Sequence, residues 1–87
     1  MRNAGVGTDI QHAFGKRIRE LRRERGWSQE KMAEMSGMHW TCIGQVERGE
    51  RNLTLQSIQC IARALRMKIA NMFRGIDYSL EFFELLD

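Results

Sequence analysis

Residues 28–49 have the sequence SQEKMAEMSGMHWTCIGQVERG, which predicts two short helices joined by a tight turn. Ser28 can cap a helix over residues 29–36, because its hydroxyl can accept from free backbone N–H groups of the first turn. Gly37 tolerates the positive φ that a helix C-terminus requires. A second helix is expected over about residues 40–48, and Gly49 can end it in the same way.

The spacing within this stretch is more informative than either helix alone. With Gln29 as the first position, Ala33 is the fifth, Gly37 the ninth, Ile43 the fifteenth and Val46 the eighteenth. Two helices that cross steeply need a small residue between them, a glycine in the turn and apolar residues facing a shared core. One face of the second helix then stays outside, and a helix fits the DNA major groove. The alternative is an ordinary helical hairpin in a small bundle.

The size and composition predict one all-α domain. The chain has 87 residues, no proline and no run of alternating apolar and polar residues. Its apolar runs are too short to span a membrane, and the N-terminus lacks the apolar segment of a secretory signal. Cys42 and Cys60 are far from metal-ligand spacing, so we expect reduced thiols in a cytoplasmic protein, with no metal, cofactor or disulfide.

Charge is unevenly distributed along the chain. All fourteen Lys and Arg residues lie within residues 1–76, together with seven of the eleven acidic residues, whereas residues 77–87 hold four acidic residues and no basic ones. A basic body with an acidic tail is compatible with a polyanionic partner.

The first helix is expected to follow a disordered tail over residues 1–7. Thr8 begins a capping-box pattern with Gln11, and Gly26 can end the helix. The apolar positions at helical spacing are Ile10, Phe14, Ile18 and Leu21. The opposite face carries Lys16, Arg17, Arg19, Arg22, Arg23 and Arg25. This basic face is interpreted mainly as solvated, with one or two residues near phosphate, and Trp27 is expected to pack in the core.

Two more helices are predicted beyond Gly49. Thr54 can cap a helix from Leu55 to about Arg66, and a short helix over residues 69–74 can end at Gly75. The apolar face of the longer helix is Leu55, Ile58, Ile61, Ala62 and Leu65.

Residues 76–87 form an apolar and acidic C-terminal extension. They crowd large apolar side chains into a segment for which so small a core has little room. We expect a homodimer contact here. The alternatives are folding back onto the first helix or a strand that pairs with its symmetry mate.

The segment GKRIRELRRERGWSQEKMAEMSG, with IGQVERGERNLTLQSIQCIARAL after it, resembles the lambda Cro and repressor-type helix-turn-helix family, also called the XRE family, of bacterial and phage regulators. The resemblance covers about residues 10–74. The ERGERNLTL segment is similar to controller proteins of restriction–modification systems. The resemblance implies a compact five-helix DNA-binding domain over residues 8–75, a symmetric dimer and a palindromic operator.

Site residues follow from the family by position in this sequence. The DNA base contacts implied are Trp40, Thr41, Cys42, Gly44 and Gln45. The expected phosphate contacts are Gln29, His39, Arg48, Arg51 and Asn52. Arg22 and Glu47 match a largely buried ion pair that holds the first helix against the recognition helix.

Two of these positions depart from the family pattern. Many relatives have Arg and Tyr where this chain has Trp40 and Cys42. Trp40 lacks the bidentate donors that hold guanine, so it either contacts a thymine methyl or the sugar–phosphate chain, or packs beside Met38 and His39. Gln45 has the better chemistry for a base edge, because its amide can donate to and accept from adenine.

Two functions are consistent with this pattern. The first is a sequence-specific DNA-binding transcriptional regulator that binds a palindromic operator as a homodimer through the helix at about residues 40–48. The alternative is an antitoxin-type or other interaction module whose C-terminal tail binds a partner protein. An enzyme is not expected, because His12 and His39 are far apart in sequence and no catalytic triad or phosphate loop is suggested.

Overall fold

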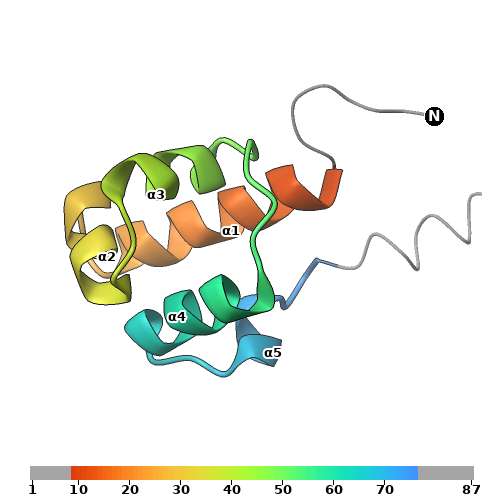
Figure 1. Cartoon of the computed structure of the whole chain (residues 1–87). Helices are drawn as coiled ribbons and strands as arrows, with labels where there is room; N and C mark the ends of the chain where they lie inside the picture. The colour runs from red at the N-terminus through yellow and green to blue at the C-terminus, as the bar shows by residue number, and fades with distance from the viewer. Residues whose placement is uncertain (1–8, 77–87) are drawn as a thin grey trace, which may run out of the picture.

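A computed structural model describes residues 9–76 of the chain, and these residues form an all-α fold with no strand. The helices are α1 (Asp9–Glu24), α2 (Gln29–Ser36), α3 (Trp40–Glu47), α4 (Leu55–Leu65) and α5 (Ile69–Met72). Figure 1 shows α1 with α3 on one side and α4 and α5 on the other. The predicted Thr8 cap, the tail over 1–7 and the part of the extension over 77–87 lie outside the described residues. Within residues 9–76, no helix combines the length and apolar character needed to cross a membrane.

The helix ends around the central turn form as the sequence predicts. The Ser28 hydroxyl oxygen accepts a hydrogen bond from the backbone N–H of Lys31 at 3.0 Å. Gly37 has φ 72°, and the N–H of Met38 returns to the carbonyl oxygen of Ala33 at 3.1 Å. Gly49, at φ 76°, follows the end of α3. These local bonds fix the short connection that makes α2 and α3 cross.

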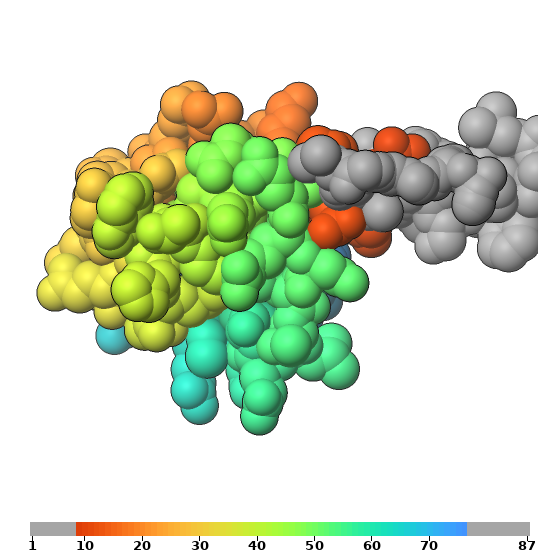
Figure 2. Space-filling view, turned by 45° about the horizontal axis from the view of Figure 1, so that its top comes forward, coloured from red at the N-terminus to blue at the C-terminus, as the bar shows by residue number. Residues whose placement is uncertain are grey.

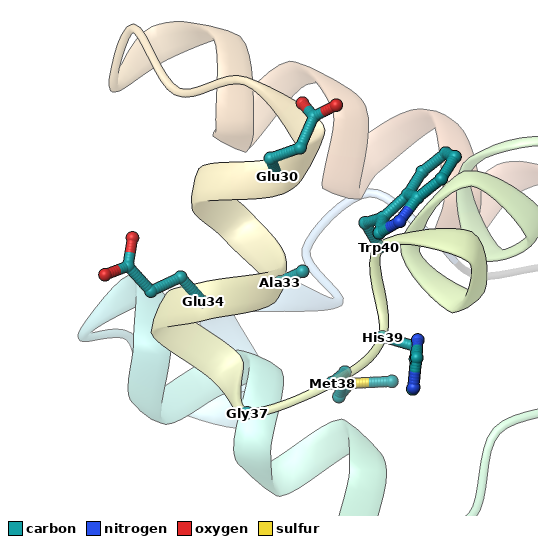
Figure 3. A pocket seen from close by; sticks show the side chains of 7 residues that line it. All are labelled: Glu30, Ala33, Glu34, Gly37, Met38, His39 and Trp40. Carbon is teal, nitrogen blue, oxygen red and sulfur yellow. The ribbon is translucent and has the colours of Figure 1, made fainter.

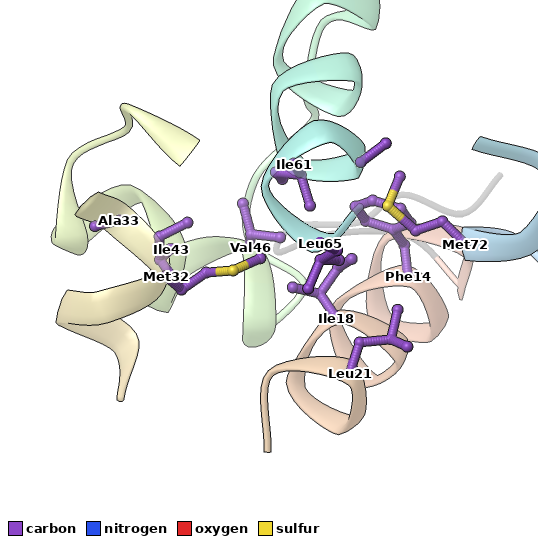
Figure 4. Packing of buried hydrophobic residues seen from close by; sticks show 11 residues of the cluster. Phe14, Ile18, Leu21, Met32, Ala33, Ile43, Val46, Ile61, Leu65 and Met72 are labelled. Carbon is purple, nitrogen blue, oxygen red and sulfur yellow. The ribbon is translucent and has the colours of Figure 1, made fainter. Parts of the chain in front are cut away.

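The core is one apolar cluster drawn from all five helices. Its fully buried members include Ile18, Met32, Ile43, Ile61 and Met72. Figure 4 shows these side chains converging between the helices. The apolar face of α4 therefore packs into the core over most of the length of the helix, as its spacing predicts. Trp27 also packs against this cluster, as expected.

Two residues expected on apolar core faces are instead exposed. Ile10 is 48% exposed and Leu55 is 83% exposed. Each lies in the first turn of its helix, α1 or α4. Helical spacing predicts the direction of a side chain, but it does not show where the neighbouring helix ends.

Two arginines assigned to the solvated face of α1 have structural partners. Arg17 donates to the carbonyl oxygens of Met72 at 3.2 Å and Asn71 at 3.0 Å. Arg25 donates to the carbonyl oxygen of Leu65 at 2.8 Å. These carbonyls lie at the C-terminal ends of α5 and α4, where a cation is favoured by the helix dipole. The two side chains thus tie α1 to both C-terminal helices.

The C-terminal helices end differently from the prediction. Arg66 caps α4 in the left-handed region, with φ 57°, without the glycine that usually occupies such a position. The helix α5 spans only residues 69–72 rather than 69–74. Phe73 follows it and stacks on Phe14 of α1 with ring centroids 4.9 Å apart. This contact anchors the end of the described chain on α1.

Candidate nucleic-acid interface

The inner side of α3 is fixed by a buried ion pair. Arg22 Nε lies 2.6 Å from Glu47 Oε2, and Arg22 Nη2 donates to Glu47 Oε1 at 2.9 Å. Both residues are buried. Arg22 Nη1 also donates to the carbonyl oxygen of Trp27 at 2.8 Å. This bidentate geometry joins α1 and the α1–α2 connection to the last turn of α3.

The carboxylate also stabilises the charged form of its partner. The hydrogen bond from Arg22 to Glu47 raises the pKa of the Arg22 guanidinium, and this effect outweighs the opposing effect of burial. Arg22 therefore remains a cation in the folded protein. The pair is a fixed electrostatic bond between two helices.

Backbone contact between α1 and α3 accompanies this pair. A Cβ added to Gly15 would lie inside van der Waals distance of the carbonyl oxygen of Val46 and 2.8 Å from that of Glu47. The absence of a side chain at Gly15 therefore lets α1 approach the end of α3 directly. The helix α3 is therefore held by both backbone and side-chain contacts.

Gln29 connects the start of α2 to the same carboxylate. Its Nε2 donates to Glu47 Oε1 at 3.1 Å. A Cβ added to Gly44 would lie 3.7 Å from Gln29 Oε1 and 3.2 Å from Arg48 Nη1. Gly44 is thus buried beneath the side chains of two expected phosphate contacts, rather than forming an exposed edge of α3.

The outer side of α3 exposes polar and aromatic groups. Trp40 is 57% exposed, Thr41 is exposed and Gln45 is half-buried. Figure 2 shows the atoms of α3 and the following loop, yellow-green to green, on the surface between α1 and α4. Cys42 differs from these residues, because its side chain packs against the apolar cluster.

Three basic or polar residues after α3 extend this exposed surface. Arg48 caps α3 and its Nε lies 3.1 Å from Glu50 Oε2. Arg51 Nη1 donates to Gln45 Oε1 at 2.9 Å. Asn52 is exposed in the same loop. The structure therefore brings Gln45, Arg48, Arg51 and Asn52 to one end of α3.

The opposite end of α3 borders a shallow hollow against α2. Figure 3 shows Trp40 and His39 on one side of the hollow and Glu30 and Glu34 projecting from α2 on the other. Met38 also contributes to its lining. His39 is exposed and caps α3 through its backbone, without a side-chain cap bond. The two carboxylates make this hollow unfavourable for a phosphate, so a phosphate near His39 would have to lie on its outer side.

Sequence reasoning missed the pairings between these side chains. Gln29 and Glu47 come from different helices, and Gln45 and Arg51 are separated by the end of α3. No periodicity within one helix signals such contacts. Among residues 9–76, no group of three or more His, Cys, Asp or Glu side chains is placed to hold a metal ion.

Comparisons with known proteins agree with this geometry. The HTH_3 helix-turn-helix family matches residues 18–71. The control protein C.SmaI of Serratia marcescens is 41% identical over 64 residues, which cover 74% of this chain and 76% of that protein. The control protein C.BamHI of Bacillus amyloliquefaciens is 40% identical over 58 residues, covering 66% of this chain and 72% of that protein.

A solved structure gives the same result. The restriction–modification controller protein C.AhdI from Aeromonas hydrophila superimposes with a TM-score of 0.74 at 41% identity, covering 76% of this chain and all of that one. The chain belongs to the helix-turn-helix family of DNA-binding transcriptional regulators. This confirms the fold and the family predicted from the resemblance over about residues 10–74.

Proposed function

We propose that this regulator binds a palindromic operator as a homodimer, with α3 of each subunit in the major groove. The observation that carries the proposal is the two-sided arrangement of α3. Its inner side is fixed by the buried Arg22–Glu47 pair. Its outer side presents Thr41 to solvent, with the half-buried Gln45 on the same helix and the exposed Arg51 in the loop that follows. Two-fold symmetry would place the two α3 helices in successive major grooves, roughly 34 Å apart.

Base contacts are proposed along the exposed face of α3. Thr41 and Gln45 have hydrogen-bonding groups suited to base edges, and Trp40 has an apolar surface suited to a thymine methyl. Cys42 and Gly44, also predicted as base contacts, lie deeper in the structure. Any DNA contact they make would come from backbone or from the sulfur edge.

Phosphate contacts are proposed to surround this face. The candidates are Gln29, His39, Arg48, Arg51 and Asn52. The first of these begins α2, where free backbone N–H groups and the helix dipole favour an anion. Contacts of this kind from the arginines supply affinity without sequence preference and make binding weaken as salt rises.

The biological role proposed is control of a restriction–modification system. The relatives C.SmaI, C.BamHI and C.AhdI carry the names of control or controller proteins. This chain covers about three quarters of C.SmaI and all of C.AhdI. We infer a cytoplasmic DNA-binding role with no catalytic step. These relatives do not favour the antitoxin-type alternative.

Selection of binding sites from random duplex DNA, repeated at two salt concentrations, tests the proposal. We expect an inverted repeat with fixed half-site spacing at both concentrations. Weak binding without a motif, which disappears as salt rises, would show that only phosphate contacts operate. A partner protein captured by the C-terminal extension would then become the alternative to pursue.

A further inference from the structure

Gln45 and Arg51 are joined by a hydrogen bond on the proposed DNA-facing surface. Arg51 Nη1 donates to Gln45 Oε1 at 2.9 Å. A guanidinium has donors but no acceptor, so the amide oxygen of Gln45, and not its amide nitrogen, must face Arg51. The glutamine amide is therefore oriented before DNA is present.

This orientation changes which base the glutamine suits. In the major groove, adenine presents an acceptor at N7 and a donor at its N6 amino group, so a free glutamine can bind both. With Arg51 beside the amide oxygen, the N6 amino group would approach a positively charged guanidinium. Guanine instead presents two acceptors, N7 and O6.

We propose that Gln45 and Arg51 act as a donor-only pair that selects guanine at one position in each half-site. The amide nitrogen of Gln45 donates to one guanine acceptor, and a remaining N–H of Arg51 donates to the other. Arg51 is then a specificity-determining residue, not simply a phosphate contact. This proposal rests on the proposed function, because it requires α3 to lie in the major groove.

The neighbouring arginine provides a matched comparison. Arg48 lies at the end of the same helix, is exposed and carries the same charge. Its Nε lies 3.1 Å from Glu50 Oε2, so its nearest partner is an acidic side chain and not a base-contacting amide. Arg48 therefore shares the electrostatic attraction for DNA but not the contact with Gln45.

The test is binding-site selection with the unaltered protein, Arg51→Ala, Arg48→Ala and Gln45→Ala. The position at which Gln45→Ala loses its preference identifies the base pair that Gln45 contacts. We expect the unaltered protein to prefer guanine over adenine there by about tenfold, the size of one good bidentate contact. Arg51→Ala should shift that position toward adenine, whereas Arg48→Ala should weaken all sequences alike and keep guanine.

Three results would contradict the proposal that Gln45 and Arg51 together select guanine. They are adenine preference in the unaltered protein, no position that responds to Gln45→Ala, and an Arg51→Ala protein that binds all sequences more weakly with its preference unchanged. All three results are compatible with an inverted repeat in the selected DNA, so none of them would contradict the proposed function. Only the absence of any repeat with the unaltered protein would refute the proposed function itself. Thermal unfolding of each variant verifies that it is folded, and Gln45 and Arg51 both lie outside the apolar cluster.

Discussion

The carboxylate of Glu47 lies at the centre of a small hydrogen-bond network. This carboxylate binds the guanidinium of Arg22 and the amide of Gln29, and Arg22 in turn binds the Trp27 carbonyl oxygen. A buried ion pair contributes little net stability compared with an apolar pair of the same shape. Removing one partner is different, because the other charge then stays buried without compensation.

Replacing Glu47 tests this directly. Glu47→Ala should lower the free energy of unfolding by about 3 kcal/mol, since Arg22 would remain buried and unpaired. Urea unfolding followed by circular dichroism measures the change. Glu50→Ala is the control, because Glu50 is exposed and its ion pair with Arg48 is worth at most about 1 kcal/mol. Equal losses in the two variants would contradict a structural role for the buried pair.

The pH dependence that Arg22 contributes to stability follows from the direction of its pKa shift. The pKa of Arg22 is raised in the folded protein, so the stability it contributes is fully present below the ordinary pKa of a guanidinium. That contribution is lost only as pH rises through the higher folded-state value. Stability at neutral and moderately alkaline pH should therefore be insensitive to Arg22 titration.

At the scale of helices, local chemistry predicts where α2 begins and ends and where α4 begins. Ser28 and Thr54 cap their helices through their own hydroxyl oxygens, and Gly37 takes the left-handed conformation. Each of these needs only neighbours within a few residues. The end of α4 gave no such signal, because Arg66 occupies the left-handed position instead of glycine.

The conformation of Arg66 leads to a stability prediction. Arg66→Gly should raise the free energy of unfolding by about 0.5–1 kcal/mol, because the left-handed region is unfavourable for residues with a Cβ. Arg63→Gly is the matched control within α4 and should lower it by about 1 kcal/mol. Thermal unfolding measured for both variants distinguishes them. Destabilisation by Arg66→Gly would mean that the arginine side chain contributes more than its backbone conformation costs.

Other features of the helices depend on packing between segments far apart in sequence. The spacing of α1 placed Arg17 and Arg25 on one basic face, but their partners belong to α5 and α4. The same limitation applies to Gln45, whose contact with Arg51 forms across the end of α3. The position of α3 and the exposure of Trp40 and Thr41 could be predicted from sequence. The burial of Gly44 and the bond between Gln45 and Arg51 could not, because both depend on side chains outside α3.

At the scale of the whole molecule, dimerisation is the main prediction that extends beyond the described chain. Truncation after Ile76 should shift the protein from dimer to monomer, because residues 77–87 are expected to contribute apolar contact surface. Sedimentation velocity at several concentrations measures the shift. Circular dichroism of the truncated chain serves as the control for folding.

An unchanged sedimentation profile would show that residues 77–87 do not form the dimer interface. Leu55 and Ile69 would then become the next candidates, since both are apolar and exposed at the starts of α4 and α5. A polar substitution at each position would test them. The two outcomes thus separate an interface on the extension from one on the folded body.

The contacts on the inner side of α3 also bear on the thermodynamics of association. Gly15 allows close backbone approach, and Arg22, Glu47 and Gln29 join three helices through side-chain bonds. Held in this way, α3 is preorganised, so the proposed docking on DNA would not have to restrict its backbone further. In the proposed complex, the conformational entropy lost on binding would then fall on exposed side chains such as Trp40 and Arg48, and we expect a correspondingly higher affinity for DNA.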